Sequence, residues 1–139
     1  FNCMASYQKF NSFVEALAEK AHNLGSDALM VALSSVAPVA TNAVLTDLTQ
    51  ISYTNLSARA LTTASSAQTS GTYKLVVNDL TLTASGGAVA PFRYITIYND
   101  TAANKELIGY YDYGSTVTLA DGDQFVLDFD GTNGVIQIA

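Results

Sequence analysis

The chain has 139 residues, the length of one domain, and only 13% of them are charged, against roughly 25% in a typical soluble domain. The net charge is −6 and the six Lys and Arg form no basic stripe, so we expect no nucleic-acid partner. No apolar stretch approaches the roughly 20 residues of a membrane span, so we expect no membrane partner, and the single Cys3 excludes an intrachain disulfide.

The first predicted element is a helix over residues 10–24. Ser12 and Glu15 have the spacing of a capping box, and Gly25 stands where a glycine commonly ends a helix. Apolar residues recur at three- and four-residue steps, which gathers them on one face: Phe10, Phe13, Val14, Leu17, Ala21 and Leu24. We expect this face to pack on the protein's own sheet.

The period changes to two after the predicted helix. Leu29, Val31 and Leu33 are the large residues of an alternating run, which predicts a strand over 27–33 with one strongly buried face. Residues 34–50 are interpreted as a connection that contains a candidate helical turn at 41–48. Residues 57–70, rich in Ser and Thr, are interpreted as a weakly apolar strand followed by a loop.

Alternation resumes at Tyr73 and shifts by one residue before Leu80, which predicts a bulge or bend at Asn78-Asp79. Gly86-Gly87 predicts a turn. The segment Phe92–Tyr98 is apolar at both odd and even positions, which is typical of a strand that is central or covered on each face.

The last third of the chain contains four short apolar runs separated by turn dipeptides such as Asp121-Gly122. The runs are Glu106–Asp112, Thr116–Leu119, Gln124–Phe129 and Val135–Ile138. They predict a β-meander. For residues 1–139 we therefore expect a single mainly β domain, an antiparallel β-sandwich or jelly roll of about eight or nine strands with one N-terminal helix. Residues 1–10 could form an extended N-terminal arm.

Residues able to carry catalytic chemistry are sparse. His22 is the only histidine, and its helical-wheel position predicts a solvated side chain without the companions of a zinc site or a nucleophile pair. Asp112 and Asp128 could form a glycosidase pair only if they lie close together, and no motif supports that pair. Asp121, Asp123, Asp128 and Asp130 form an acidic cluster, but the spacing of an EF-hand calcium loop is absent, and turn chemistry accounts for Asp121 and Asp130 without a metal. We expect no enzyme, no metal and no cofactor.

Tyrosines are concentrated around one predicted strand, at Tyr110, Tyr111 and Tyr113. They could form an aromatic platform for a sugar or a protein partner. The alternative is a set of cross-strand aromatic pairs within the sheet. Because Tyr110 and Tyr111 point to opposite faces of a strand, at least one of them should belong to the core.

Several stretches taken in order give the chain a family resemblance. They are FNSFV at Phe10–Val14, DALMVAL at Asp27–Leu33, GTYKLV at Gly71–Val76, PFRYITIYNDT at Pro91–Thr101, LIGYYDYG at Leu107–Gly114, TLADGDQF at Thr118–Phe125 and the closing segment Phe129–Ile138. Together they resemble small virion structural proteins of tailed bacteriophages. The resemblance implies a β-rich component of the particle, either a capsid decoration (cement) protein or a tail component, and it supplies no catalytic residues.

Our first hypothesis is a decoration protein that binds and stabilises the outer shell of a phage head. Its partners would be the major capsid protein or other virion proteins, and it would act as a homo-oligomer on the surface of the virion. We expect the segment Met4–Phe10 to be one contact arm through Tyr7 and Phe10. The tyrosines Tyr110, Tyr111 and Tyr113 are further candidate partner contacts.

Two other hypotheses remain open. A tail or tail-tip component would belong to the same kind of particle, although the apolar runs look too short for the long hairpins of a tail tube. A carbohydrate-binding β-sandwich, with or without calcium, would use the tyrosines as its binding platform.

Overall fold

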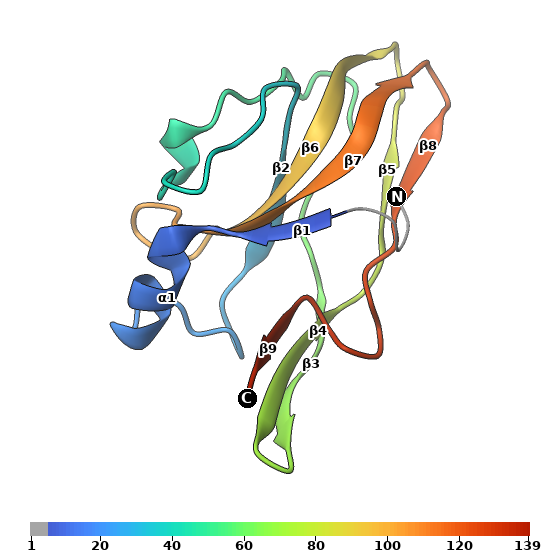
Figure 1. Ribbon diagram of the computed structural model, residues 1–139. Coiled ribbons are helices and arrows are strands. Elements are labelled where there is room, and N and C mark those ends of the chain that lie inside the picture. The colour runs from blue at the N-terminus through green and yellow to red at the C-terminus, as the bar shows by residue number, and fades with distance from the viewer. Residues whose placement is uncertain (1–5) are drawn as a thin grey trace.

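The computed structural model describes residues 6–139 (Figure 1). The protein is 47% strand and 8% helix, and every strand pair is antiparallel. These observations confirm a mainly β protein with one α-helix and antiparallel sheets. Within the described residues, no helix is both long and apolar enough to cross a membrane.

The largest sheet has four strands in the order β1-β7-β6-β2. Its members are β1 (Ser6–Lys9), β7 (Leu107–Leu119), β6 (Val89–Asn99) and β2 (Leu29–Ser34). The two central strands, β6 and β7, follow each other in the chain and form one long hairpin, which curves across the molecule in Figure 1.

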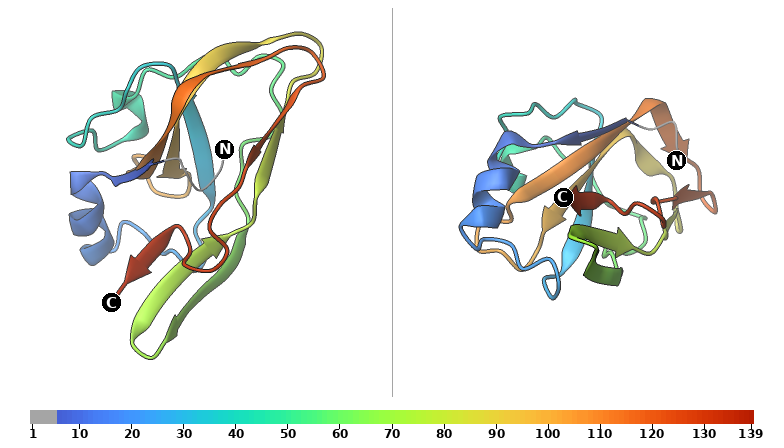
Figure 2. Two further views of the ribbon diagram at one scale, coloured as in Figure 1. Left: turned by 45° about the vertical axis from the view of Figure 1, so that its right-hand side comes forward. Right: turned by 60° about the horizontal axis from the view of Figure 1, so that its bottom comes forward.

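Two smaller sheets complete the fold. The first has the order β3-β4-β9 and contains β3 (Thr63–Thr69), β4 (Thr72–Val77) and β9 (Ile136–Ile138). The second pairs β5 (Leu80–Thr83) with β8 (Gln124–Leu127). Ser70 and Gly71 connect β3 to β4 with positive φ angles of 51° and 84°, the backbone of a tight hairpin turn. This hairpin extends away from the four-stranded sheet (Figure 2).

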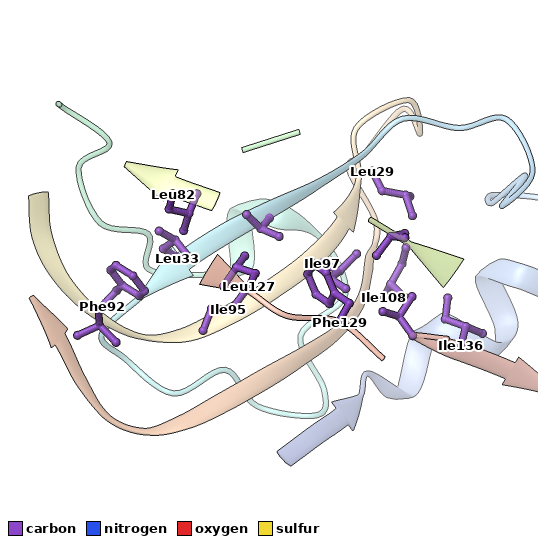
Figure 3. Close-up of a cluster of buried hydrophobic side chains, with 14 of the residues drawn as sticks. Leu29, Leu33, Leu82, Phe92, Ile95, Ile97, Ile108, Leu127, Phe129 and Ile136 are labelled. Carbon is purple, nitrogen blue, oxygen red and sulfur yellow. The ribbon is translucent and has the colours of Figure 1, made fainter. Parts of the chain in front are cut away.

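The main core lies between one face of the four-stranded sheet and the two smaller sheets. Ile95, Ile97 and Ile108 project into it from β6 and β7, facing Leu127 and Phe129 of the C-terminal segment (Figure 3). A smaller cluster on the opposite face contains Phe10, Ala32, Tyr98 and Leu107. Both faces of β6 are thus covered, which confirms the prediction for Phe92–Tyr98.

The N-terminal helix is shorter than predicted. Helix α1 covers Asn11–Ala18, and Lys20 leaves the helical conformation with a φ of 71°. The predicted capping box is absent because Phe10, not Ser12, is the N-cap residue, and the Asn11 amide donates to the Ala40 carbonyl at 2.9 Å. Ending the helix early allows Leu24 to turn back into the main core, where it is buried.

The predicted terminal meander is wrong. The runs 106–112 and 116–119 belong to the single strand β7, which continues through Gly114 at a φ of 93°. The next two runs pair elsewhere, β8 with β5 and β9 with β4. Each terminal strand therefore finds a partner from the middle of the chain, a long-range pairing that turn dipeptides cannot encode.

The middle of the chain agrees with the prediction in part. The bend at Asn78-Asp79 is confirmed, because β4 and β5 end up in different sheets on either side of it. Gly86 and Gly87 have positive φ angles in the expected turn. The interpretation of 57–70 is wrong in order, since the strand β3 follows the irregular part instead of preceding it.

The structure also revises the predicted N-terminal arm. Residues 6–9 form β1, which pairs with β7 so that Tyr7 lies opposite Tyr111 and Lys9 opposite Gly109. Within the described part of the Met4–Phe10 segment, Ser6–Lys9 thus form an edge strand of the largest sheet, and Phe10 leads into α1. Residues 1–5, with Cys3 and Met4, lie outside the described residues.

Candidate functional site

Tyr7, predicted as a partner contact, packs within the chain. Its ring centroid lies 5.0 Å from that of Tyr111 on the neighbouring strand. Burial raises the pKa of the Tyr7 phenol to about 12, so the hydroxyl stays protonated at neutral pH. The ring covers Gly109, where any side chain would collide with it. Tyr7 therefore attaches β1 to β7.

Phe10, the second predicted contact of the arm, is fully buried. Its ring centroid lies 5.3 Å from that of Tyr110, and the two rings cover the smaller cluster beside Leu107. Phe10 has no surface to present to a partner, so its assignment as a contact is wrong. Burying this phenylalanine contributes stability to the domain itself.

The strand tyrosines are distributed over two faces of the sheet. Tyr110 packs on the smaller cluster, whereas Tyr111 packs on the main core with its ring 6.0 Å from that of Phe129. Tyr113 meets Phe125 edge-on at 5.1 Å. The prediction that at least one of Tyr110 and Tyr111 belongs to the core is confirmed. These rings form aromatic pairs inside the fold, and the three tyrosines do not share one face as a platform.

The acidic side chains are engaged in local structure. Asp112 forms an ion pair with Arg93 at 2.8 Å, and this contact holds the pKa of the carboxyl below its usual value. Asp121, Asp123 and Asp130 accept hydrogen bonds from backbone amides of turns, as predicted for Asp121 and Asp130. Within residues 6–139, no group of three or more His, Cys, Asp and Glu is placed to hold a metal ion.

His22 is buried, and the prediction of a solvated side chain is wrong. Because the chain turns sharply after α1, the imidazole lies beside Phe13 and its Nδ1 is 3.0 Å from Asn99 Nδ2. Asn99 Oδ1 accepts from the amides of Thr101 and Ala102, which fixes Nδ2 as the side facing the histidine. The histidine must therefore accept at Nδ1 and carry its proton on Nε2.

An apolar groove lies between the N-terminal helix and the C-terminal strand, and we name it the α1–β9 groove. Phe13, Val14 and Leu17 of α1 line it, together with Tyr7 and Lys9 of β1 and residues 133–138 at the C-terminal strand. Its volume is about 480 Å³. Val14 is 52% exposed and Ile138 is 43% exposed, so two large aliphatic side chains meet water here.

A second hollow of about 500 Å³ continues the groove past Leu17 and Ile138, which line both. Lys20, Leu24 and Tyr73 are among its further lining residues. Leu17 and Ile138 thus lie at the junction of a longer depression that follows α1 and the exposed side of β9.

Both strands that line the groove are edge strands. In the described sheets, β1 has β7 as its only neighbour and β9 has β4 as its only neighbour. Each leaves one edge of backbone donors and acceptors without a strand partner. An extended chain segment can pair with such an edge, and the adjoining apolar side chains then give it specificity.

Sequence reasoning missed this groove. The predicted apolar stripe of the helix contains Val14 and Leu17, but its expected burial on the sheet hid the exposure of Val14. The position of β9 beside α1 depends on pairing with β4, which lies far away in the chain. The sequence feature that could have indicated the groove is β9 itself, a short strand without charged residues.

Comparisons of the chain with protein-family models, with curated proteins and with solved structures found no match.

Proposed function

We propose that this chain is a structural protein of a tailed-phage particle, most specifically a capsid decoration protein that binds the outer shell of the head and stabilises it. The observation that carries the proposal is the α1–β9 groove, an exposed apolar surface bordered by two edge strands. Such a surface binds a neighbouring protein by burying area and by strand pairing, without a catalytic centre.

Composition supports the same mode of action. Charged residues make up 13% of the chain, so covering its surface desolvates few charges. On a capsid lattice, modest contacts repeated by symmetry sum to strong stabilisation. The resemblance in sequence to virion structural proteins makes the phage particle the first place to look for the partner.

A tail component is the second candidate, and the length of one hairpin favours it. In the sequence, the apolar runs look too short to form the long hairpins of a tail tube. The structure instead has β6 with 11 residues and β7 with 13 residues, joined as consecutive strands. A hairpin of this length is suited to packing side by side in a ring.

The proposal is tested by adding the purified chain to phage particles made with its gene deleted. We expect saturable binding to heads, recovered by co-sedimentation, and release of DNA at a higher temperature after binding. Binding confined to tails would favour the second candidate. Failure to bind either part of the particle would contradict both.

A further inference from the structure

We propose that the α1–β9 groove binds an extended segment of a neighbouring protein, one that combines apolar with acidic residues and adds as a strand to the open edge of β9. The inference rests on the proposed function only for the identity of that neighbour as a virion protein. The groove, its edge strand and its charge are properties of this chain alone.

The helix supplies an apolar wall for the segment. Phe13 and Leu17 lie on one side of α1, and Val14 beside them is 52% exposed. Across the groove, Ile138 of β9 is 43% exposed. Alternate side chains of an added strand would point toward this wall, so apolar residues at every second position would bury it.

The strand edge supplies the backbone partners. Strand β9 pairs with β4 through Ile136, Gln137 and Ile138, and it is the outermost strand of its sheet. It contains no proline and no charged residue, the features that commonly protect an edge from pairing. The edge beside the apolar wall is thus open to an additional antiparallel or parallel strand.

Charge distinguishes the partner. The residues lining the two hollows include two of the six basic residues, Lys9 and Lys20, and none of the twelve acidic ones. Glu15 of α1 and Glu19, its C-cap residue, fall opposite Phe13 and Leu17, because each helical residue advances by about 100°. A protein of net charge −6 therefore presents a basic rim around this apolar groove.

This distribution argues against a second copy of the chain as the occupant. Two copies joined symmetrically at the groove would bring Lys9 and Lys20 of both copies together with no lining carboxylate between them. An acidic segment gains attraction from the same two lysines. We therefore assign the groove to a different protein and make self-association an outcome of the test.

The direct probe is a blocked ten-residue peptide of alternating valine and glutamate, labelled with fluorescein and titrated with the full chain while anisotropy is recorded. Two control peptides alternate valine with lysine and serine with glutamate. We expect saturable binding of the Val-Glu peptide, at least about tenfold tighter than either control. Methyl resonances of Val14 and Ile138 should shift during the titration. Equal binding of the Val-Lys peptide, or no binding of the Val-Glu peptide, would overturn the inference.

Variants separate the contributions of the groove. Val14→Asp should weaken binding by at least about tenfold, whereas Val36→Asp, at a position 55% exposed and outside the groove, should leave it unchanged. The double variant Lys9→Glu and Lys20→Glu should reverse the preference toward the Val-Lys peptide. Thermal melts of each variant verify that the fold is retained.

Self-association is measured on the same samples by analytical ultracentrifugation. A dimer that Val14→Asp abolishes would overturn the assignment to a different protein. The proposed function fails separately: a chain that binds the Val-Glu peptide but no phage particle retains the groove assignment and loses the virion role. A chain that decorates heads with unchanged affinity after Val14→Asp loses the groove assignment and retains the virion role.

Discussion

Gly109 shows how one residue can position an edge strand. It lies in β7 opposite Lys9, and a Cβ atom placed there would lie 2.5 Å from Cζ of Tyr7. The absence of a side chain leaves room for the Tyr7 ring beside Gly109, where it also contacts the ring of Tyr111. The close approach of β1 to the sheet therefore depends on glycine at this position.

Gly109→Ala should lower the free energy of unfolding by about 1–3 kcal/mol, because Tyr7 or β1 must move to make room. The matched control is Gly131→Ala, where a Cβ meets nothing within 4 Å, and its effect should stay within about 0.5 kcal/mol. Urea denaturation monitored by circular dichroism measures both. Equal effects of the two substitutions would contradict the packing assigned to Tyr7.

His22 predicts a dependence of stability on pH. Burial lowers its pKa below 6.5, although the charges of Glu106 and Asp27 act in the opposite direction. Asn99, which donates to the imidazole, also favours the neutral form. The unfolded chain therefore binds a proton on His22 more readily than the folded chain does. The contribution of neutral His22 to the free energy of unfolding is present above about pH 6.5 and is lost as the pH falls below that value.

The comparison that isolates this effect is His22→Gln, which leaves every carboxylate in place. Between about pH 7.5 and pH 5, the unfolding free energy of the unchanged protein should fall more steeply than that of the variant. Urea titrations at each pH measure the difference. Parallel curves would show that the folded and unfolded chains bind the His22 proton equally.

At the scale of elements, Phe10 joins β1 to the start of α1. It is fully buried between Tyr110, Leu107 and Tyr98, and its amide donates to the Ile108 carbonyl at 3.2 Å. Phe10→Ala should cost about 3–5 kcal/mol, against less than about 0.5 kcal/mol for the exposed Val36→Ala. Thermal unfolding of the two variants measures both losses of stability. A cost below about 1 kcal/mol would mean that this segment is detached, as an arm would be.

The elements also show what a sequence can predict. Alternation located β2, whose large side chains enter the main core, and apolar residues at both odd and even positions located β6, which is covered on both faces. The register shift located the bend at Asn78-Asp79 because β4 and β5 enter different sheets. The meander failed since β8 and β9 pair with β5 and β4, and local turn signals carry no information about such partners.

The same limit applies to the candidate site. The tyrosines were identifiable from sequence, but their assignment to aromatic pairs needed the positions of Phe125 and Phe129. The α1–β9 groove needed the placement of β9 beside α1, a tertiary fact. Lys9 of the groove and Lys20 of the second hollow lie far from residues 133–138 in the chain.

At the scale of the whole molecule, charge is distributed unevenly. The chain carries a net charge of −6, yet the lining of the groove contains Lys9 and that of the second hollow contains Lys20, with no acidic residue in either. Attraction of an acidic segment to this rim should weaken with salt, since exposed charges are screened over about 8 Å at physiological ionic strength. The burial of Val14 and Ile138 by the bound segment should persist at high salt.

The role of salt can be measured with the Val-Glu peptide. Raising sodium chloride from about 0.05 M to about 0.5 M should weaken its binding severalfold and should leave the effect of Val14→Asp in place. Titrations at both salt concentrations provide the comparison. Binding that is insensitive to salt would remove Lys9 and Lys20 from the recognition of the segment.

We propose that this protein belongs to the virion and binds its neighbours through the α1–β9 groove. An electron cryomicroscopy map of the intact particle tests it most directly. We predict density that fits this fold repeated over the capsid lattice, with an extended segment of an adjacent protein lying along β9. A particle without such density would contradict the virion role, and density that leaves the groove open to solvent would contradict the mode of binding.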